Sequence, residues 1–319
     1  MSDPTPRVVD VAVGVIERPD GQVLLACRPE GRPFAGYWEF PGGKVEPDET
    51  IAQAMSRELH EELGLTEVSS TPWIVVGHTY PHATVRLFFR RVRAWQGEPE
   101  SREGQALAWR SPMSLDVQPL LPASIQPIRW LTLPSIYRIS CASLIGVQSF
   151  ERSLEALLHE VPASQPVWMQ LREPELSEKD FSRLFERLMA LRSRLPLKLI
   201  VSSRHPQSCW QQADGVHLTA RDLAGLRERP AVPWVGASCH DRADLNAAAS
   251  AGCDFAVLGP VAPTESHPGA AVMGFDGLAE HLSLSRLPVF ALGGMKLGDL
   301  PAAREAGASG VALMRAAWA

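Results

Sequence analysis

The stretch GGKVEPDETIAQAMSRELHEELGL, residues 42–65, begins with a double glycine and contains five glutamates and one aspartate. Its apolar residues recur at steps of three and four, at Ala52, Met55, Leu59 and Leu63. This period is typical of an amphipathic helix with one face on a core. Thr50 is a suitable N-cap and Gly64 a suitable C-cap. The stretch therefore predicts a helix that lies between these two residues.

The predicted helix places Glu58, Glu61 and Glu62 on one neighbouring face. Like charges at this spacing repel each other by about a few tenths of a kcal/mol per pair, and Arg57 is the only arginine or lysine in the helix that could offset them. Mg2+ prefers hard oxygen ligands and commonly bridges carboxylates to substrate phosphates. A metal-binding face therefore explains this charge better than an ordinary solvated face does.

The glycines before the helix fit the same interpretation, because Pro41-Gly42-Gly43 allows a tight turn in which a backbone carbonyl can approach a cation. The order Gly43, five residues, Glu49, seven residues, Arg57-Glu58-Leu59, one residue, Glu61-Glu62, one residue, Gly64-Leu65 matches every position of the Nudix box. From about Val9 to Ile128 the chain resembles Nudix hydrolases of the MutT type, which remove 8-oxo-dGTP from the nucleotide pool. The further matching motifs are EFPGGK, RRVRAWQGEPESREGQALAW and LLPA.

The Nudix resemblance implies a Mg2+ site, with Mn2+ as an alternative ion. Its implied ligands are the Gly42 carbonyl and the carboxylates of Glu58, Glu61, Glu62 and Glu103. Metal ions can neutralise a triphosphate and orient the attacking water. The implied catalytic residues are Glu58, Glu61, Glu103 and Arg57. Either Glu58 or Glu103 is the base, and Arg57 orients the glutamates by bidentate pairing.

The resemblance also implies residues for substrate binding. Arg28 stands where the family has a phosphate-contacting arginine, although a strand-end cation is the alternative interpretation. Phe40, with the backbone of Glu39, Pro41 and Gly42, lines the nucleobase side, or else Phe40 is core. Ser124 replaces an asparagine that reads the purine edge. Since serine offers one rotatable hydroxyl and asparagine a fixed donor and acceptor, we expect a broader range of bases.

Length and composition bound the remaining possibilities. A chain of 319 residues with 45% hydrophobic content is long enough for two domains. The net charge of −5 argues against direct DNA binding. The sequence shows neither a membrane-length apolar run nor a signal peptide, so we expect a cytoplasmic protein without membrane contact. Five widely spaced cysteines without a CxxC motif favour reduced, mostly buried thiols.

The pattern changes near residues 131–138, so we predict domains at 1–131 and 137–319. After this point eight short apolar runs alternate with helical stretches: YRIS, VWMQL, KLIVSS, GVHL, WVGAS, FAVLGP, VFALGG and GVALM. Such alternation predicts a parallel barrel. The predicted fold class is α/β, with a Nudix α/β/α sandwich built on a mixed sheet, followed by a compact TIM (β/α)8 barrel.

The second part, roughly Tyr137 to Ala319, resembles the thiamine phosphate synthase family of the ThiE/TenI type. The motifs in the family's order are QLRE, ADGVHLTARDL, VGASCH, LGPVAPT and FALGGM. The resemblance implies a site for a phosphate-bearing ligand at the C-terminal ends of the strands. Its residues would be Gln170, Arg172, Asp222, Gly293 and Gly294.

Several departures from this family argue against synthase activity. Pro174 replaces a lysine, Ser202-Ser203 replaces an Asn-Asp pair, and Glu265-Ser266-His267 stands where another lysine is expected. Losing cations and a carboxylate should weaken the binding of a metal-bound pyrophosphate. His217 alternates with apolar residues in GVHL, so it points either into the barrel mouth or into a satisfied hydrogen bond.

Three hypotheses of function follow. The first is a Mg2+-dependent nucleoside triphosphate pyrophosphohydrolase that converts 8-oxo-dGTP to 8-oxo-dGMP and pyrophosphate and so avoids mutation. In the second, the Nudix domain hydrolyses a thiamine-related pyrophosphate and the barrel binds the substrate or product. In the third, the barrel is a ligand-sensing or structural partner of the hydrolase. Few residues follow the last strand to form a helix, so the first domain or a second subunit in a homodimer is a candidate cover.

Overall fold

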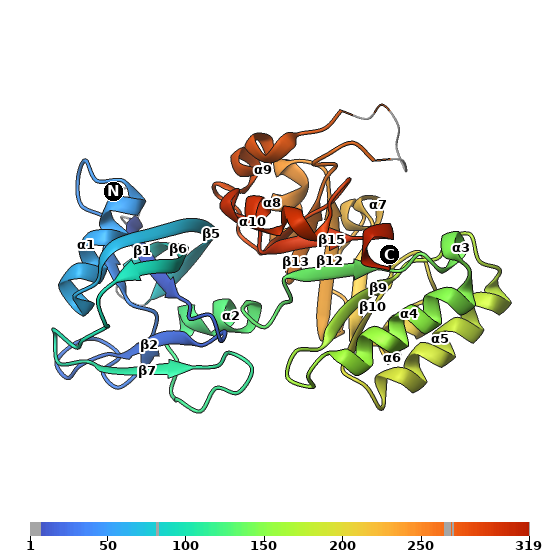
Figure 1. The fold of residues 1–319 in the computed structure, drawn as a ribbon. Helices are drawn as coiled ribbons and strands as arrows, with labels where there is room; N and C mark the ends of the chain where they lie inside the picture. The colour runs from blue at the N-terminus through green and yellow to red at the C-terminus, as the bar shows by residue number, and fades with distance from the viewer. Residues whose placement is uncertain (1–7, 81–82, 265–268, 270, 319) are drawn as a thin grey trace. The chain divides into compact units, whose positions relative to one another are not determined.

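The structure is a computed structural model that describes residues 8–80, 83–264, 269 and 271–318. The chain divides into two compact units, Met1–Leu133 and Pro134–Ala319 (Figure 1). Each unit is built around its own β-structure. The predicted segment Glu265-Ser266-His267 lies outside the described residues.

The first unit contains two sheets. The strands are β1 (Val8–Ile16), β2 (Val23–Cys27), β3 (Trp38–Glu39), β4 (Gly42–Lys44), β5 (Thr66–Tyr80), β6 (Ala83–Gln96) and β7 (Ala106–Arg110). One sheet has the order β4-β1-β6-β5 and the other the order β3-β2-β7. Because β1 pairs with β6 in parallel and with β4 antiparallel, the larger sheet is mixed, as the sequence predicts.

Two helices complete this unit, α1 (Ile51–Leu63) and α2 (Pro122–Trp130). Thr50 and Gln53 form a capping box at the start of α1, and Gly64 ends it in the left-handed conformation, so both predicted caps are confirmed. The buried stripe is Ala54, Met55, Leu59 and Leu63. Ala52 is exposed, so its predicted place among the buried residues is wrong, and Ala54 is buried in its stead.

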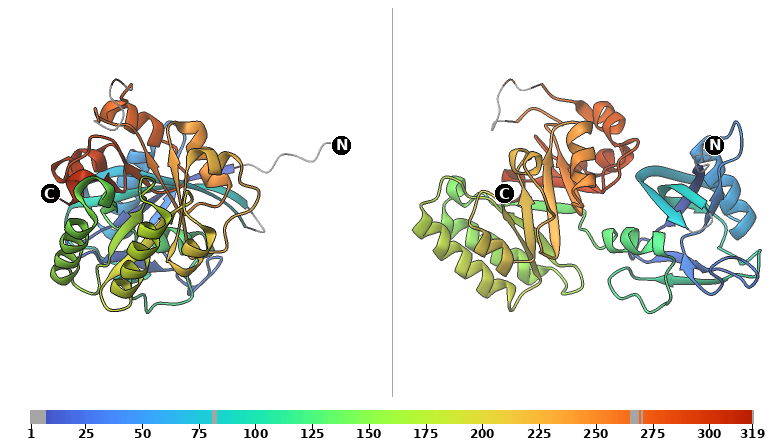
Figure 2. Two further views of the ribbon diagram at one scale, coloured as in Figure 1. Left: turned by 90° about the vertical axis from the view of Figure 1, so that its right-hand side faces the viewer. Right: turned by 180° about the vertical axis from the view of Figure 1, so that it is seen from behind.

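The second unit is a closed barrel of parallel strands in the order β10-β11-β12-β13-β14-β15-β8-β9, which confirms the predicted barrel (Figure 2). Its strands are β8 (Ile136–Ile139), β9 (Val167–Leu171), β10 (Leu197–Ser202), β11 (Gly215–Leu218), β12 (Trp234–Cys239), β13 (Phe255–Leu258), β14 (Val289–Ala291) and β15 (Gly310–Leu313). Each strand corresponds to one of the apolar runs in the sequence.

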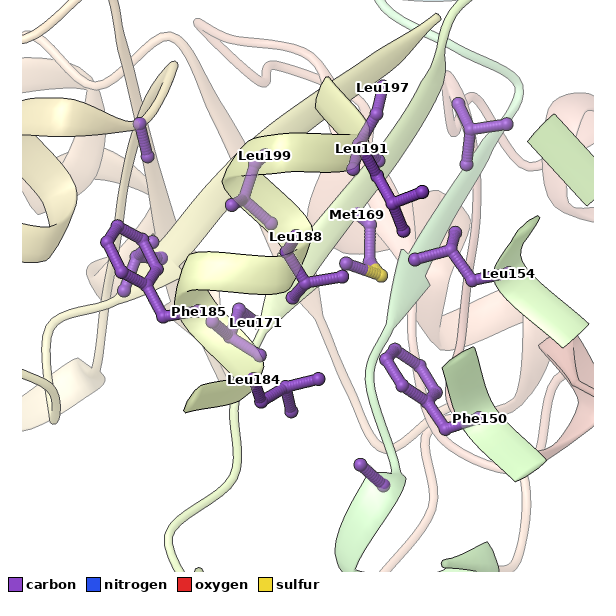
Figure 3. Packing of buried hydrophobic residues seen from close by; sticks show 14 of the residues in the cluster. Phe150, Leu154, Met169, Leu171, Leu184, Phe185, Leu188, Leu191, Leu197 and Leu199 are labelled. Carbon is purple, nitrogen blue, oxygen red and sulfur yellow. The ribbon is translucent and has the colours of Figure 1, made fainter. Parts of the chain in front are cut away.

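The barrel's helices are α3 (Ala142–Ile145), α4 (Val147–Glu160), α5 (Glu178–Arg192), α6 (Gln207–Gln212), α7 (Ala220–Ala224), α8 (Arg242–Ser250), α9 (Gly274–Leu282) and α10 (Leu300–Glu305), with short 3-10 turns η1 (Leu297–Asp299) and η2 (Arg315–Ala317). Figure 3 shows how α4 and α5 cover β9 and β10, with Phe150 and Leu154 on one helix and Leu184 and Leu188 on the other. Burying such side chains stabilises the fold by about 1.5–3 kcal/mol each.

Two buried aspartates fix the N-terminal ends of neighbouring strands. Asp214, just before β11, accepts hydrogen bonds from Leu199 N at 2.9 Å and from the Arg192 guanidinium. Asp254, just before β13, accepts from Val235 N at 2.8 Å and from Arg229. These pairs tie this end of the barrel together, so the opposite ends of the strands are left to form a binding surface.

All five cysteines are free thiols, three buried and two partly exposed, in line with the expectation of mostly buried thiols. Burial raises the pKa of the Cys141 and Cys253 thiols to about 11, so these groups stay protonated near neutral pH. In the described part of the chain, the helices are too short or too polar to cross a membrane.

Candidate active site

The glycines before α1 allow the face of the helix that carries Glu58, Glu61 and Glu62 to approach β4. A Cβ atom at Gly43 would lie 2.2 Å from the carboxylate of Glu58, and one at Gly42 would lie 2.1 Å from the carbonyl oxygen of Ala12. Gly42 also has a φ of 142°, a conformation open mainly to glycine. Residue 42 therefore requires glycine for the strand pairing with β1, whereas a side chain at residue 43 would displace the Glu58 carboxylate.

Arg57 connects the glutamates of this region. Its Nε and Nη2 atoms donate to the two carboxylate oxygens of Glu49 at 3.0 and 2.9 Å. Its Nη1 atom donates to Glu58 at 2.8 Å and to Glu61 at 3.1 Å. The bidentate partner is thus Glu49, whose role is to fix Arg57. Arg57 in turn orients Glu58 and Glu61.

Glu62 is the most strongly perturbed carboxyl of the group. Its Oε2 atom accepts a hydrogen bond from Gly42 N at 3.2 Å. Burial raises its pKa to about 8, and the nearby carboxylates of Glu58, Glu103 and Glu39 add to the rise. Burial also raises the pKa of Glu58, although Arg57 opposes that shift. The carboxylates are therefore close enough to repel one another.

A loop that is distant in sequence brings Glu103 to this face. Arg102 N and Gln105 Nε2 both donate to the carbonyl oxygen of Glu62, at 3.1 and 3.0 Å. Glu103 N donates to Gln105 Oε1 at 2.9 Å. Gln105 is only 6% exposed, so it links the end of α1 to the loop. The Glu103 carboxylate itself pairs with Arg32 at 2.9 Å.

These residues suit a hard divalent cation. In the part of the chain that the structure describes, no three His, Cys, Asp or Glu side chains already form a compact metal cluster. The carboxylates are instead bonded to Arg57, Arg32 and the Gly42 amide. Their mutual repulsion and the side-chain-free surface of Gly43 under Glu58 fit a cation that would replace these partners.

The proposed phosphate-binding arginine lies next to a half-buried acid. Arg28 Nη1 donates to Glu39 at 2.6 Å, and Arg28 Nε donates to the carbonyl oxygen of Pro33 at 2.8 Å. Burial raises the pKa of Glu39, and Arg28 opposes the rise. Phe40 is 3% exposed and packs edge-on against Phe89. The structure thus places Phe40 in the core.

An aromatic group that the sequence did not reveal lies beside these residues. The Tyr80 ring lies 5.3 Å from that of Phe34 and 4.3 Å from that of His78, measured between centroids. Burial and the charge of Glu39 raise the pKa of Tyr80, while a backbone hydrogen bond from Ala123 opposes the rise. Tyr80 therefore links Glu39 to the first turn of α2. Ser124 follows in that turn and is 3% exposed.

The barrel has a separate cavity of about 2060 Å³ at the C-terminal ends of its strands. The five predicted residues of the barrel site all line it: Gln170, Arg172, Asp222, Gly293 and Gly294. Further cationic residues at its wall are Arg204, Arg221, Lys296 and Arg315. Burial lowers the pKa of Arg172, and the charge of Arg204 adds to the effect. An anion in the cavity would relieve this repulsion.

The glycines of the cavity expose backbone amides. Gly293 and Gly294 have φ angles of 93° and 66°. A Cβ atom at either position would clash, with Pro260 at 2.7 Å and with the carbonyl oxygen of Pro263 at 2.5 Å. Within the described residues neither amide donates to a protein acceptor. Successive free amides of this kind bind anions.

The same cavity does not fit the metal that the synthase resemblance implies. Ser203 stands at the position of the missing acid and donates its hydroxyl to Asp222 at 2.5 Å. Thr219 Oγ1 donates to the same carboxylate oxygen at 2.7 Å. The buried carboxylate of Glu173 is occupied by the amides of Ala142 and Ser143. One hydroxyl-bound carboxylate therefore replaces a pair of metal-binding acids.

Comparison with known proteins agrees with this division. Residues 7–131 match the NUDIX domain family, and residues 136–317, more than half of the chain, match the family described as thiamine monophosphate synthase. The first unit is 39% identical over 125 residues to an 8-oxo-dGTP diphosphatase of Haemophilus influenzae, covering 39% of this chain and 92% of the relative. It is 41% identical over 121 residues to a CTP pyrophosphohydrolase of Escherichia coli, covering 37% and 87%.

The second unit has its own relative. It is 35% identical over 178 residues to a putative thiamine-phosphate synthase of Geobacter sulfurreducens, covering 53% of this chain and 81% of the relative. Two independent families thus account for the two units. The chain belongs to the Nudix family through its first unit, which makes it a hydrolase, and to the thiamine monophosphate synthase family through its second.

Proposed function

We propose that the first unit is a Mg2+-dependent nucleoside triphosphate pyrophosphohydrolase that converts 8-oxo-dGTP to 8-oxo-dGMP and pyrophosphate. Such an enzyme would remove oxidised nucleotides before DNA replication and so avoid mutation. The observation that supports the proposal most directly is the contact of Glu58 with Gly43, which brings a carboxylate face against β4. The relatives named as diphosphatase and pyrophosphohydrolase support the reaction class.

The metal ligands in this proposal are the Gly42 carbonyl, Glu58, Glu61, Glu62 and Glu103. A bound Mg2+ would neutralise phosphate charge and favour deprotonation of a water. Mn2+ has similar oxygen preferences and is the alternative ion. Arg57 keeps Glu58 and Glu61 in place through the bonds already described. Glu58 and Glu103 remain the two candidates for the base that accepts the proton of the attacking water.

On the substrate side, Arg28 would bind phosphate oxygens after leaving Glu39. The aromatic rings of Phe34 and Tyr80 would contact the nucleobase, because they lie against each other and Tyr80 is near Glu39 and bonded to the backbone of Ala123, the residue before Ser124. Ser124 offers a single hydroxyl to the base edge. The relatives act, by their names, on different nucleotides, and Ser124 is compatible with either a purine or a pyrimidine.

For the second unit we propose a phosphate-binding module without synthase activity. Its support is the cationic cavity, the amides of Gly293 and Gly294, which have no acceptor among the described residues, and the Ser203–Asp222 bond in place of two acids. The functional domains would be residues 1–131 and 137–319 of a cytoplasmic protein, a homodimer being one arrangement. A Nudix unit that hydrolyses a thiamine-related pyrophosphate is the alternative, favoured by the relative named as a synthase.

The reaction is tested by product analysis on the full-length protein. With 8-oxo-dGTP and Mg2+, we expect 8-oxo-dGMP and pyrophosphate in equal amounts. The Glu61→Gln variant should lose this activity, whereas Asp222→Asn, in the barrel cavity, should retain it. Release of inorganic phosphate and a nucleoside diphosphate would contradict the proposed bond cleavage. Formation of thiamine phosphate from its two precursors would contradict the proposal for the barrel.

A further inference from the structure

Arg32 lies in the loop between β2 and β3 and pairs with a carboxylate of the proposed metal site. Its Nη2 atom donates to Oε2 of Glu103 at 2.9 Å, although the two residues are 71 positions apart in the sequence. Among the described residues, Glu103 is the one hydrogen-bond partner of the Arg32 guanidinium. The two side chains are 51% and 36% exposed. The pair therefore joins two loops at the surface of the site.

The loop that carries Arg32 is held by its own hydrogen bonds. Arg28 N donates to the carbonyl oxygen of Tyr37 at 2.9 Å, which joins the two ends of the loop. Ala35 N donates to the carbonyl oxygen of Arg32 at 3.1 Å. The Nε atom of Arg28 donates to the carbonyl oxygen of Pro33 at 2.8 Å. Because the backbone around residue 32 is fixed in this way, the guanidinium can change its partner by rotation of the side chain alone.

The charge of Arg32 acts on both sides of the site. Burial raises the pKa of Glu39, and the charges of Arg28 and Arg32 oppose the rise. Burial also raises the pKa of Glu62 to about 8, and the charge of Glu103 adds to that rise. Arg32 is thus near the carboxylate that binds Arg28, and it pairs with a carboxylate that repels Glu62. It lies between the substrate side and the metal side.

The pair of Arg32 and Glu103 is weak enough to be exchanged. An exposed ion pair of this kind changes an equilibrium constant by about fivefold at most. A divalent cation that binds several carboxylates at once can therefore take Glu103 from Arg32. The guanidinium then keeps its positive charge and its N–H donors but has lost its acceptor. Arginine in this state suits a phosphate group, to which it can donate two parallel hydrogen bonds.

We propose that Arg32 exchanges partners in the reaction: it pairs with Glu103 in the free enzyme and binds phosphate oxygens of the substrate once Glu103 binds the cation. Arg28, beside Glu39 on the nucleobase side, would bind the phosphate next to the nucleoside. Arg32, on the metal side, would bind the two phosphates that leave as pyrophosphate. The inference rests on the proposed function. It has two consequences of opposite sign, because Arg32 opposes cation binding and favours substrate binding.

The competition for Glu103 is tested by Mn2+ binding to the full-length protein without nucleotide, measured by paramagnetic resonance of the free ion. Arg32→Gln should bind Mn2+ about two- to fivefold more tightly than the wild type. The matched control is Arg86→Gln, because Arg86 lies in the same unit, is also 51% exposed and pairs with the carboxylate of Asp10. This control should keep the wild-type affinity. Equal affinities of Arg32→Gln and the wild type would overturn the inference.

A double-mutant cycle shows whether Arg32 acts through Glu103. In the Glu103→Gln background, Arg32→Gln should leave the Mn2+ affinity unchanged, because no carboxylate is released there. The same gain in affinity in both backgrounds would mean that Arg32 acts only as a like charge near the cation. That result would contradict the exchange of partners.

The phosphate contact is tested with the two products as inhibitors of 8-oxo-dGTP hydrolysis. Arg32→Gln should weaken inhibition by pyrophosphate about tenfold and leave inhibition by 8-oxo-dGMP unchanged. KM should rise while kcat stays the same, because the contact is made to bound substrate and transition state alike. Inhibition by pyrophosphate that is the same in variant and wild type would overturn the phosphate contact.

The two sets of measurements separate this inference from the proposed function. If the wild type binds no Mn2+, the proposed function fails and the inference fails with it. If the wild type binds Mn2+ and hydrolyses 8-oxo-dGTP but Arg32→Gln behaves like the wild type, only the inference fails. If 8-oxo-dGTP is not hydrolysed and Arg32→Gln still binds Mn2+ more tightly, the proposed substrate is wrong and the competition for Glu103 is confirmed.

Discussion

Gly43 and Glu58 lie so close together that a Cβ atom at residue 43 would sit 2.2 Å from the Glu58 carboxylate. This contact joins strand β4 to helix α1 at the centre of the proposed metal site. The carboxylate can occupy its position only because residue 43 has no side chain. The position of the Glu58 carboxylate therefore explains why the motif has glycine at residue 43.

The first prediction concerns this contact. Gly43→Ala should displace Glu58 and lower kcat/KM about a hundredfold, because misplacing a catalytic group by roughly 1 Å has effects of that size. The matched control is Gly77→Ala on β5, where an added Cβ meets nothing within 4 Å. Steady-state kinetics and a thermal melt of both variants check the prediction. Equal activity of Gly43→Ala and the wild type would contradict the proposed role of Glu58.

Gln105 is predicted to act through Glu103. Because its side chain bonds both Glu103 N and the carbonyl of Glu62, Gln105→Ala should release the loop and lower kcat about tenfold or more. A double-mutant cycle separates positioning from general damage. Adding Gln105→Ala to Glu103→Ala should cause little further loss of kcat. Full additivity of the two effects would show that Gln105 acts independently of Glu103.

Metal removal should destabilise the protein in a way that depends on Glu62. A ligand at about a hundredfold excess over its Kd stabilises the folded state by about 2.7 kcal/mol, so Mg2+ should raise the melting temperature and EDTA should reverse the effect. Glu62→Gln should reduce the Mg2+-induced shift. Glu98→Gln, an exposed glutamate outside the site, should keep it. A shift that is the same in both variants would exclude Glu62 from the site.

Base selectivity should respond to residue 124. Ser124→Asn introduces a donor and an acceptor in one plane, so we expect the preference for 8-oxo-dGTP over dGTP to rise about tenfold. Ser124→Ala removes the hydroxyl and should lower selectivity or leave it unchanged. The ratio of kcat/KM for the two nucleotides measures the effect. If Asn and Ala change the ratio alike, residue 124 does not contact the base.

The pH dependence of stability should reflect two barrel histidines. Burial lowers the pKa of His205 to about 4 and that of His217 to about 3, from an ordinary 6.5. Below pH 6.5 the unfolded chain binds protons that the folded barrel does not. The stability that the neutral histidines contribute above pH 6.5 is therefore lost as the pH falls from 6.5 through the folded pKa values of about 4 and 3.

Thermal melts of His217→Gln between pH 4 and 7 test this expectation. The variant should be less stable than the wild type at pH 7 and should show a flatter decline toward low pH. His159→Gln removes an exposed histidine of α4 and should keep the wild-type slope. A wild-type slope in His217→Gln would mean that His217 is not the neutral group of the folded barrel.

The sequence predicted both units because their patterns are local. The helix from Ile51 to Leu63 has its period and both caps within one stretch, and the barrel strands are short apolar runs between helices. The misplaced Ala52 shows the limit of this approach: steps of three and four lead from Leu63 and Leu59 through Met55 to Ala52, whereas the buried residue is Ala54, which this period does not predict.

The parts of the site that the sequence did not reveal depend on long-range contacts. Arg32 lies in none of the matching motifs, and Gln105, although it lies in RRVRAWQGEPESREGQALAW, was given no role by the sequence. Their roles come from pairing with Glu103 and Glu62 across the fold. Tyr80 joins the site only because the end of β5 meets the first turn of α2. For His217 the sequence left two interpretations open, and the structure supports the satisfied hydrogen bond.

The most direct test of the proposed function is a panel of kcat/KM values for the full-length protein with Mg2+. The substrates are 8-oxo-dGTP, dGTP, CTP, and the hydroxymethylpyrimidine and thiamine pyrophosphates. We predict that 8-oxo-dGTP is hydrolysed most efficiently and that the thiamine-related compounds are poor substrates. A clear preference for either thiamine-related pyrophosphate would contradict nucleotide-pool sanitation. It would mean that the Nudix unit hydrolyses compounds related to the family of the barrel.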